Sequence, residues 1–288
     1  MEDRRETVDG EIAVHANGNA PGRLSAGFLR AYRRLPYLSP LMWRVFWRNF
    51  IVFRKTWKAN IMFNFIEPLL YLSAMGFGLG AYVQNINGLP YLNYLATGLI
   101  ASSAMWATSY ECTYGSFIRM DFQKTYHAII ATPVSVDDVV AGDLLYGAFK
   151  SVMYGSIILI VNLLLGIVVS PWALLLPVVL LVAGLLFSVL ALTWTSFAPN
   201  FDFFNYYFTL IITPMFLFSG VFFPLEGIPQ WAQYVAWFTP LYHVVEVSRG
   251  LVLGQVSPAL WGHLAWVTVM ALLLVNVPIV RIRERLLP

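Results

Sequence analysis

Six long apolar runs constrain this chain more than any other feature, because each is long enough to cross a bilayer as a helix. A membrane-spanning helix needs about 20 predominantly apolar residues. The runs lie at about residues 61–82, 92–118, 141–169, 172–197, 204–223 and 259–280. Because only helices and closed barrels satisfy the backbone in lipid, we expect an all-α polytopic membrane protein with six transmembrane helices.

The composition agrees with this class: 59% of the 288 residues are hydrophobic and 11% are charged, far from the average of soluble domains. A seventh apolar stretch, residues 224–257, is interrupted by prolines and charged residues, so it is expected to form broken or re-entrant helices. Irregular backbone at membrane depth must be covered by protein or face water. Its polar candidates are Glu226, His243, Glu246 and Arg249.

The cations predict the topology, since short loops rich in Lys and Arg stay in the cytoplasm. Of the 18 Lys and Arg residues, eleven precede residue 59, two lie in the loop after the second run, and three lie near the C-terminus. The alternate loops are almost free of them. Both termini are therefore expected to be cytoplasmic.

The chain before the first run divides into two parts. Residues 1–38 are expected to form a mobile cytoplasmic tail, and residues 39–58 an amphipathic helix. In the second part an aromatic stripe lies beside cations, a pattern typical of helices in the headgroup layer, where cations meet lipid phosphates. This helix is either an anchor or a sliding gate for the permease domain expected at residues 59–288.

A short polar helix at about residues 120–131 is expected to connect the second and third spans on the cytoplasmic side. It is the part of the chain most like a surface built to contact another protein. Since no energy-converting motif occurs elsewhere, powered work would have to pass through this connector. Its candidate contact residues are Asp121, Gln123, Tyr126, His127, Ile129 and Ile130.

Sequence motifs for catalysis are absent. The chain has no GxxxxGK[ST] phosphate loop and no HExxH zinc motif, and its single cysteine, Cys112, excludes an intrachain disulfide. The best acid/base pair is His243 with Glu246, one helical turn apart. An intramembrane enzyme that uses this pair is therefore the alternative from another functional class.

Ionisable residues inside spans are costly and so invite functional hypotheses. They are Glu67, Glu111, Asp143 and Lys150. If the second and third spans are antiparallel neighbours, Glu111 and Lys150 lie at similar depth and can pair, either as a structural tie or as part of a transport or proton-relay path. Glu67 and Asp143 are near the cytoplasmic surface, where hydrated cavities would accommodate them.

Aromatic residues repeat at three or four positions along the second span and gather at the start of the fifth. The candidates are Trp106, Tyr110, Tyr114, Phe117 and Tyr206. Rings with polar edges suit sugars and amphipathic ligands, but such clusters also form interfacial belts and ordinary packing. Both a cargo path and a belt remain open.

The order of these segments resembles the permease of a type-2 ABC exporter, and within that family the nodulation protein J branch. The resemblance covers about residues 40–285. It is carried by ASSAMWATSYECTYGSFIRM, ATPVSVDDVVAGDLL, SFAPNFDFFNYYFTLIITPMFLFSGVFFPLEGIP and FTPLYHVVEVSRGLVLG.

The resemblance implies a homodimer in the bacterial cytoplasmic (inner) membrane, bound to two copies of a cytoplasmic ABC ATPase. ATP and Mg would be bound by that partner, with no cofactor in this chain and no nucleic acid involved. The connector would sit in a groove of the ATPase, and residues 224–250 would shape the outer exit. The implied cargo is a lipo-oligosaccharide, polysaccharide or glycolipid-like molecule, with hydrophobic drug-like molecules as the alternative.

Overall fold

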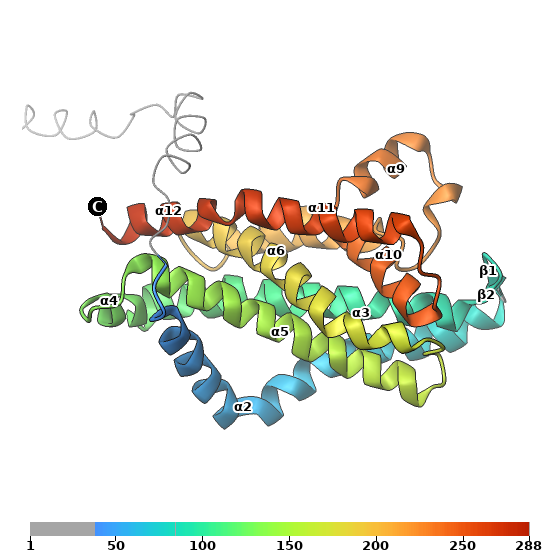
Figure 1. Ribbon diagram of the computed structural model, residues 1–288, viewed down its shortest axis with the longest axis horizontal. Coiled ribbons are helices and arrows are strands. Elements are labelled where there is room, and N and C mark those ends of the chain that lie inside the picture. Colours follow the sequence, from blue (N-terminus) through green and yellow to red (C-terminus); the bar gives the residue numbers. More distant parts are fainter. Residues whose placement is uncertain (1–37, 84, 288) are drawn as a thin grey trace, which may run out of the picture. The chain divides into compact units, whose positions relative to one another are not determined.

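The computed structural model describes residues 38–83 and 85–287, so the tail predicted for residues 1–38 lies almost entirely outside the described residues. Helices form nearly all of the described chain, which confirms the all-α class (Figure 1). The α-helices are α2 (Met42–Tyr71), α3 (Tyr91–Tyr110), α4 (Thr125–Ile130), α5 (Val136–Leu164), α6 (Leu176–Phe197), α7 (Phe203–Tyr207), α8 (Thr213–Leu217), α9 (Gln230–Trp237), α10 (Pro240–Leu253), α11 (Pro258–Leu274) and α12 (Asn276–Leu286).

Shorter helical turns extend or connect several of these helices. They are η1 (Leu72–Gly78), η2 (Leu79–Ala81), η3 (Glu111–Gly115), η4 (Ile118–Phe122), η5 (Pro171–Leu175), η6 (Phe208–Ile212) and η7 (Leu225–Gly227). Two short strands, β1 (Asn85–Ile86) and β2 (Leu89–Pro90), form an antiparallel hairpin. This hairpin joins the first expected span to the second.

Three segments of the described chain are long and apolar enough to cross a membrane: Val136–Leu164, Pro171–Phe197 and Pro258–Leu286. They correspond to the third, fourth and sixth runs of the sequence. Ile66–Ala81 and Phe203–Leu217 are shorter apolar helices. The count of six spans therefore stays a prediction, while the helical membrane class is supported directly.

Helix α5 lies at the centre of the packing, against α2, α3 and α6 (Figure 1). Small residues bring α5 and α6 close together. A Cβ on Gly184 of α6 would collide with Ser151, and one on Gly147 of α5 would collide with Ser188. Membrane helices commonly pack through such small residues, because lipid supplies no hydrophobic drive for their association.

The expected interface helix and the first half of the first span form one helix, α2, and η1 and η2 continue the span. No proline or glycine interrupts the sequence between Met42 and Glu67, so nothing in the backbone chemistry ends the helix at residue 58. The helix instead changes direction along its length (Figure 1).

The aromatic residues of α2 lie on two different surfaces, one exposed and one packed against α5. Trp43, Trp47 and Trp57 are exposed. The rings of Phe50 and of neighbouring phenylalanines instead pack edge-on against Phe149 of α5. One side of this part of α2 therefore remains open, and the other is fixed to the bundle.

The connector helix is shorter than predicted. Helix α4 covers only Thr125–Ile130, and residues up to Phe122 belong to η4, which continues the second span. Lys124 has φ 50°, and this left-handed conformation separates the two helices. The prediction of one helix over 120–131 was therefore wrong at its start.

The segment 224–257 is broken as predicted. Pro229 precedes α9, Pro240 occupies the first turn of α10, and Gly254 ends α10 with φ 74°. Proline suits a first helical turn, and glycine suits a left-handed terminus. The β1–β2 hairpin and α9 lie toward the end of the bundle opposite α4 (Figure 1).

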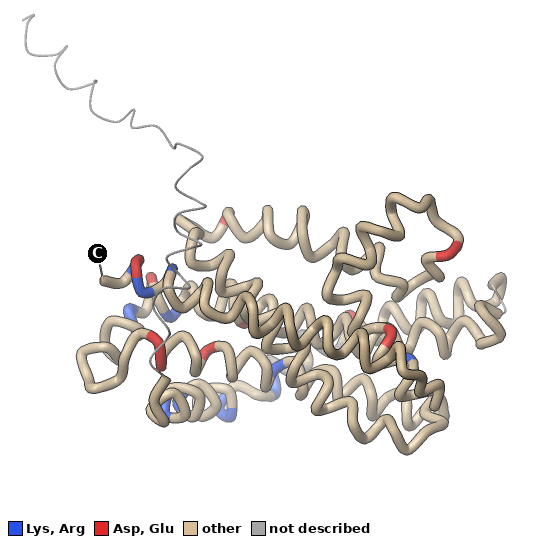
Figure 2. Tube along the Cα trace, turned by 45° about the horizontal axis from the view of Figure 1, so that its top comes forward, with Lys and Arg blue, Asp and Glu red and all other residues tan. Residues whose placement is uncertain are grey.

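The charges are distributed unevenly over the described chain. Most Lys and Arg residues lie at the end formed by α4, α12 and the start of α2 (Figure 2). Few charges occur along the middle of the bundle. This end contains the candidate functional site.

Candidate coupling site

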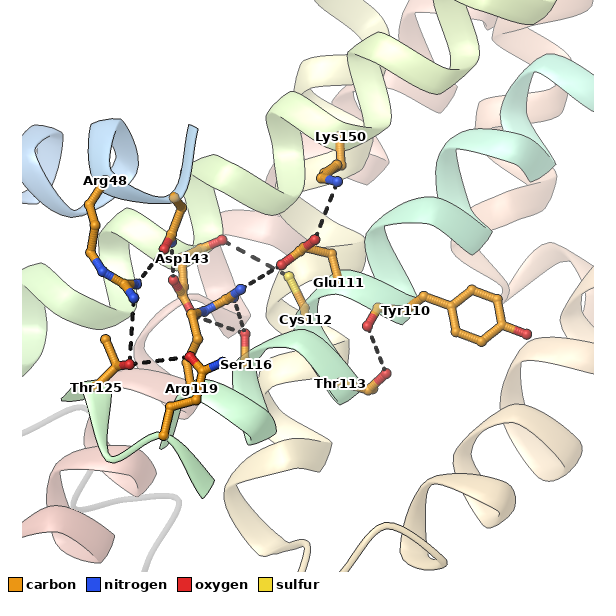
Figure 3. Close-up of polar contacts among 12 residues, drawn as sticks. Arg48, Tyr110, Glu111, Cys112, Thr113, Ser116, Arg119, Thr125, Asp143 and Lys150 are labelled. Carbon is orange, nitrogen blue, oxygen red and sulfur yellow. Dashed lines mark hydrogen bonds and ion pairs between the residues drawn. The ribbon is translucent and has the colours of Figure 1, made fainter. Parts of the chain in front are cut away.

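Asp143 lies at the centre of a buried hydrogen-bond network that joins four segments (Figure 3). Its side chain is 1% exposed. Oδ1 accepts from Asn49 Nδ2 of α2 at 2.7 Å, and Oδ2 accepts from Ser116 Oγ at 2.9 Å and Arg119 Nη2 at 3.0 Å. The hydroxyl of Tyr126 in α4 also donates to Oδ2. The connector is thus hydrogen-bonded directly to a buried side chain of α5.

The expectation that Asp143 lies in a hydrated cavity is wrong, because the side chain is buried in this network. A buried carboxylate must be paired and hydrogen-bonded, and here the guanidinium of Arg119 and three neutral donors supply these contacts. Burial and the Asp143 carboxylate also raise the pKa of Tyr126. The phenol therefore stays protonated and keeps its role as donor.

Arg119 extends the network from Asp143 to a second carboxylate. Its Nη1 lies 2.7 Å from Glu111 Oε1, and Glu111 Oε2 lies 3.4 Å from Lys150 Nζ. The predicted Glu111–Lys150 pair is confirmed as a contact between the second and third spans. Arg119 was expected in the cytoplasmic loop, but it lies inside the bundle with a side chain 13% exposed.

The predicted contact residues of the connector do not share one surface. Gln123 and His127 are exposed, and Ile129 and Ile130 are half-buried. Tyr126 is 1% exposed and faces inward. Tyr126 therefore joins α4 to the spans, and the exposed residues beside it form the outward face of the connector.

Asp121 belongs to a clamp at the C-terminal helix that was not expected from the sequence. Arg285 Nη2 of α12 lies 2.9 Å from Asp121 Oδ2, while its Nη1 donates to the backbone oxygen of Thr195 at 3.0 Å. Arg283 of the same helix pairs with Asp137 at the start of α5. The C-terminal helix therefore holds the end of the second span, α5 and α6 together. The sequence did contain a signal for these ion pairs, because the cations near the C-terminus were expected on the same side of the membrane as the predicted connector that contains Asp121.

The aromatic candidates of the second span mostly pack against the fifth. Phe208 stacks on Trp106, Tyr110 and Tyr114 with centroid distances of 5.6, 4.5 and 5.7 Å. Phe117 is buried, whereas Tyr206 is 58% exposed. The rings therefore join α3 and its extension to α7 and η6.

Glu67 lies apart from the Asp143 network. It lines a small crevice together with Tyr71, Ser103, Trp106 and Tyr110. The crevice links α2 to the edge of the stacked rings. Of the four ionisable residues in the spans, Glu67 is thus the one that the structure places beside the aromatic candidates.

The outer candidates separate into two groups. His243 is 1% exposed, and its Nδ1 lies 2.7 Å from His263 Nδ1. Glu246 instead pairs with Arg249, which lies 3.8 Å above the ring of Tyr94. The acid/base pair of His243 and Glu246 proposed from spacing is therefore not formed in the structure.

Glu226 lies with the second of these groups. It lines a cavity of about 180 Å³ that also contacts Tyr94, Glu246 and Arg249. Arg249 donates to the backbone oxygen of Gly220 at 2.9 Å. These bonds join α10 to the turn after α8 and to α3.

Apolar helices, a buried charged cluster at one end and a short connector bonded to that cluster are the features of a helical membrane protein. Comparison with known families agrees. The chain belongs to the ABC-2 type transporter family, whose model matches residues 40–253.

The relatives extend over most of the chain. It is 36% identical to nodulation protein J of Rhizobium meliloti over 250 residues, which is 85% of this chain and 94% of the relative. It is 38% identical to nodulation protein J of Rhizobium leguminosarum bv. viciae, over 75% of this chain and 83% of the relative. It is 24% identical to the inner membrane transport permease YadH of Escherichia coli, over 68% of this chain and 77% of the relative. No solved structure matches the chain.

These similarities identify a membrane transport permease subunit of the nodulation protein J type. Membership of the family also implies association with an ABC ATPase, with ATP hydrolysis in that separate chain. The resemblance stated from the sequence is thus confirmed.

Proposed function

We propose that this chain is the permease of an ATP-driven exporter that moves an amphipathic cargo out of the cytoplasm. The cargo class is a lipo-oligosaccharide, a polysaccharide or a glycolipid-like molecule. The observation that carries the proposal is the bonding of α4 to α2, the second span and α5 through Asp143. A push on this connector would reach three helices through side chains that are already in contact.

Membership of the family supports the assembly that we propose. Two permease chains form a homodimer, and each binds one ATPase subunit through the outer face of α4. The ATPase binds ATP and Mg, and this chain binds no cofactor of its own. Gln123 and His127 are exposed on the connector and available for this contact.

The orientation places α4 and both termini in the cytoplasm and the 224–257 segment outside. The gathering of Lys and Arg at the end of the bundle near α4 supports this direction (Figure 2). The membrane is the bacterial inner membrane. The count of six spans and the outer exit role of α9 and α10 are part of the same proposal.

Movement of the cargo would use the wall formed by the second and fifth spans. Tyr110 and Tyr206 are 42% and 58% exposed, so their rings lie on surfaces open to a lipid-linked molecule. The apolar part of such a cargo could stay in lipid while its polar part crosses. A hydrophobic drug-like molecule is the alternative cargo.

The experiment tests the connector as the docking surface. The permease is co-expressed with its ATPase, and co-purification and ATP hydrolysis are measured for His127→Asp and Gln123→Asp. Both variants should reduce the amount of bound ATPase, because they add charge to exposed positions of the contact. The matched control is Tyr234→Asp in α9, a 71% exposed position distant from α4. Equal ATPase binding by all three variants would contradict the assignment.

The cargo is tested in proteoliposomes with a labelled lipo-oligosaccharide, a labelled polysaccharide and a hydrophobic dye. ATP-dependent movement of either glycan supports the proposal. Movement of the dye alone supports the drug-exporter alternative and overturns the proposed cargo class.

A further inference from the structure

A cavity of about 340 Å³ lies between α2, the end of the second span and α5. Its lining includes Arg48 and Phe53 from α2, Glu111 and Arg119 from η3 and η4, and Lys150 from α5. Figure 3 shows Glu111, Arg119 and Lys150 turned toward one another, with Arg48 at the edge of the cluster. The volume is at the lower end of the range for ligand pockets, about 300–1,000 Å³.

The charges around this cavity do not balance. Three cations, Arg48, Arg119 and Lys150, face two carboxylates, Glu111 and Asp143, which leaves one positive charge in excess. The carboxylates are already shared between Arg119 and Lys150.

Arg48 holds the excess charge. Its hydrogen-bond partners are neutral: Asn49 Oδ1 at 2.9 Å and Thr125 Oγ1 at 3.5 Å. Burial and the nearby Arg119 lower the pKa of Arg48, although an arginine remains protonated at neutral pH. A half-buried guanidinium whose hydrogen-bond partners are neutral is a ready binding partner for an anion.

The walls of the cavity indicate what kind of anion fits. Val52, Phe53 and Ile118 contribute apolar surface beside the cations. Val52 is 52% exposed, and Trp43 and Trp47 are exposed farther along the same helix. An arginine beside apolar surface and exposed tryptophans is typical of sites at the lipid headgroup layer.

We infer that this cavity binds the phosphate of an anionic headgroup, with Arg48 as the principal contact. Phosphate has the charge and the geometry that guanidinium groups bind through paired hydrogen bonds. The site goes beyond general attraction of the interface helix to lipid, because it also includes buried residues of the second and third spans. It is independent of which cargo the permease exports.

The test is direct binding of fluorescent phosphatidylglycerol to the purified permease–ATPase complex, with phosphatidylcholine of the same chain length as the zwitterionic comparison. Arg48→Gln should weaken phosphatidylglycerol binding by about tenfold, the effect of losing one hydrogen bond to a charged group. Arg44→Gln is the matched control, because Arg44 is exposed one turn earlier on α2 and does not line the cavity.

A second variant keeps the test valid in case Arg48→Gln fails to fold. Val52→Glu places a carboxylate in the cavity at a half-exposed position, and should weaken binding without removing a native bond. Ile51→Glu is its control, since Ile51 is 44% exposed on the same helix but does not line the cavity. Thermal melting in phosphatidylcholine should be unchanged for all four variants.

Glycerol phosphate as a competitor separates the two sources of the ligand. Displacement of phosphatidylglycerol would show that the phosphate alone is recognised and can come from solution. Failure to displace it, with binding still lost in Arg48→Gln and Val52→Glu, would assign the site to a membrane lipid. Equal binding of the two lipids, or equal losses in the variants and their controls, would overturn the proposal.

Discussion

The hydroxyl of Tyr126 in the connector donates a hydrogen bond to the carboxylate of Asp143 in α5. The two residues lie only 17 positions apart, yet their contact joins a loop helix to the inside of a membrane span. Asp143 in turn contacts α2 and the second span. This single carboxylate therefore connects the parts that a coupled movement would have to displace together.

Replacing Tyr126 with Phe should uncouple the connector while leaving the ring packed. The change removes one hydrogen bond to a buried charged group, worth about 1.5–3 kcal/mol. We expect cargo-stimulated ATP hydrolysis to fall while basal hydrolysis and assembly persist. Tyr82→Phe is the matched control, because Tyr82 is 88% exposed. Unchanged stimulation in Tyr126→Phe would contradict the role of this bond.

Glu111→Gln should destabilise the permease strongly. It leaves the cations of Arg119 and Lys150 buried with one carboxylate fewer, and breaking a buried pair on one side costs about 3–5 kcal/mol. Thermal melting of the purified protein measures the loss. Glu284→Gln, which breaks an exposed pair with Arg281, should cost about 0–1 kcal/mol.

A double-mutant cycle checks whether Glu111 and Lys150 act as a pair. Glu111→Gln combined with Lys150→Gln should cost less than the sum of the two single changes, because removal of both partners leaves no unmatched charge between them. Additive losses would show that the two side chains stabilise the bundle independently.

Arg285→Ala should loosen the C-terminal clamp. It removes the ion pair with Asp121 and two hydrogen bonds to backbone oxygens at the end of α6. Faster proteolysis within α12 and a lower melting temperature are expected. The control is Arg281→Ala, whose pair with Glu284 is more exposed. Identical proteolysis of the two variants would exclude a special role for Arg285.

Gly184→Val should separate α5 from α6. Its new Cβ would meet Ser151 and the backbone of Ala148, and overpacking of this kind typically costs about 1–3 kcal/mol. Gly262→Val in α11 is the matched control, because a Cβ there meets no atom within 4 Å. If both variants melt like the native protein, the close α5–α6 contact is not needed for stability.

Local patterns predicted much of this arrangement. Prolines interrupt the 224–257 segment at the starts of α9 and α10, as expected. The pairing of Glu111 with Lys150 could be predicted because antiparallel neighbours place residues of similar depth together. Each of these inferences needed only local spacing or the order of the spans.

Other features depend on contacts that spacing does not contain. Arg119 looks like a loop cation in the sequence, and only the pairing of η4 with α5 turns it inward. The bond between Arg285 and Asp121 links residues 164 positions apart. The short length of α4 depends on the left-handed conformation of Lys124, a residue type that rarely adopts it.

The most direct test of the central claim is transport by the purified permease in proteoliposomes, measured with and without its ATPase. Movement of a labelled lipo-oligosaccharide should require both the ATPase and ATP, and should fall in Tyr126→Phe despite normal assembly. Transport at full rate by the permease alone, without nucleotide, would contradict the account.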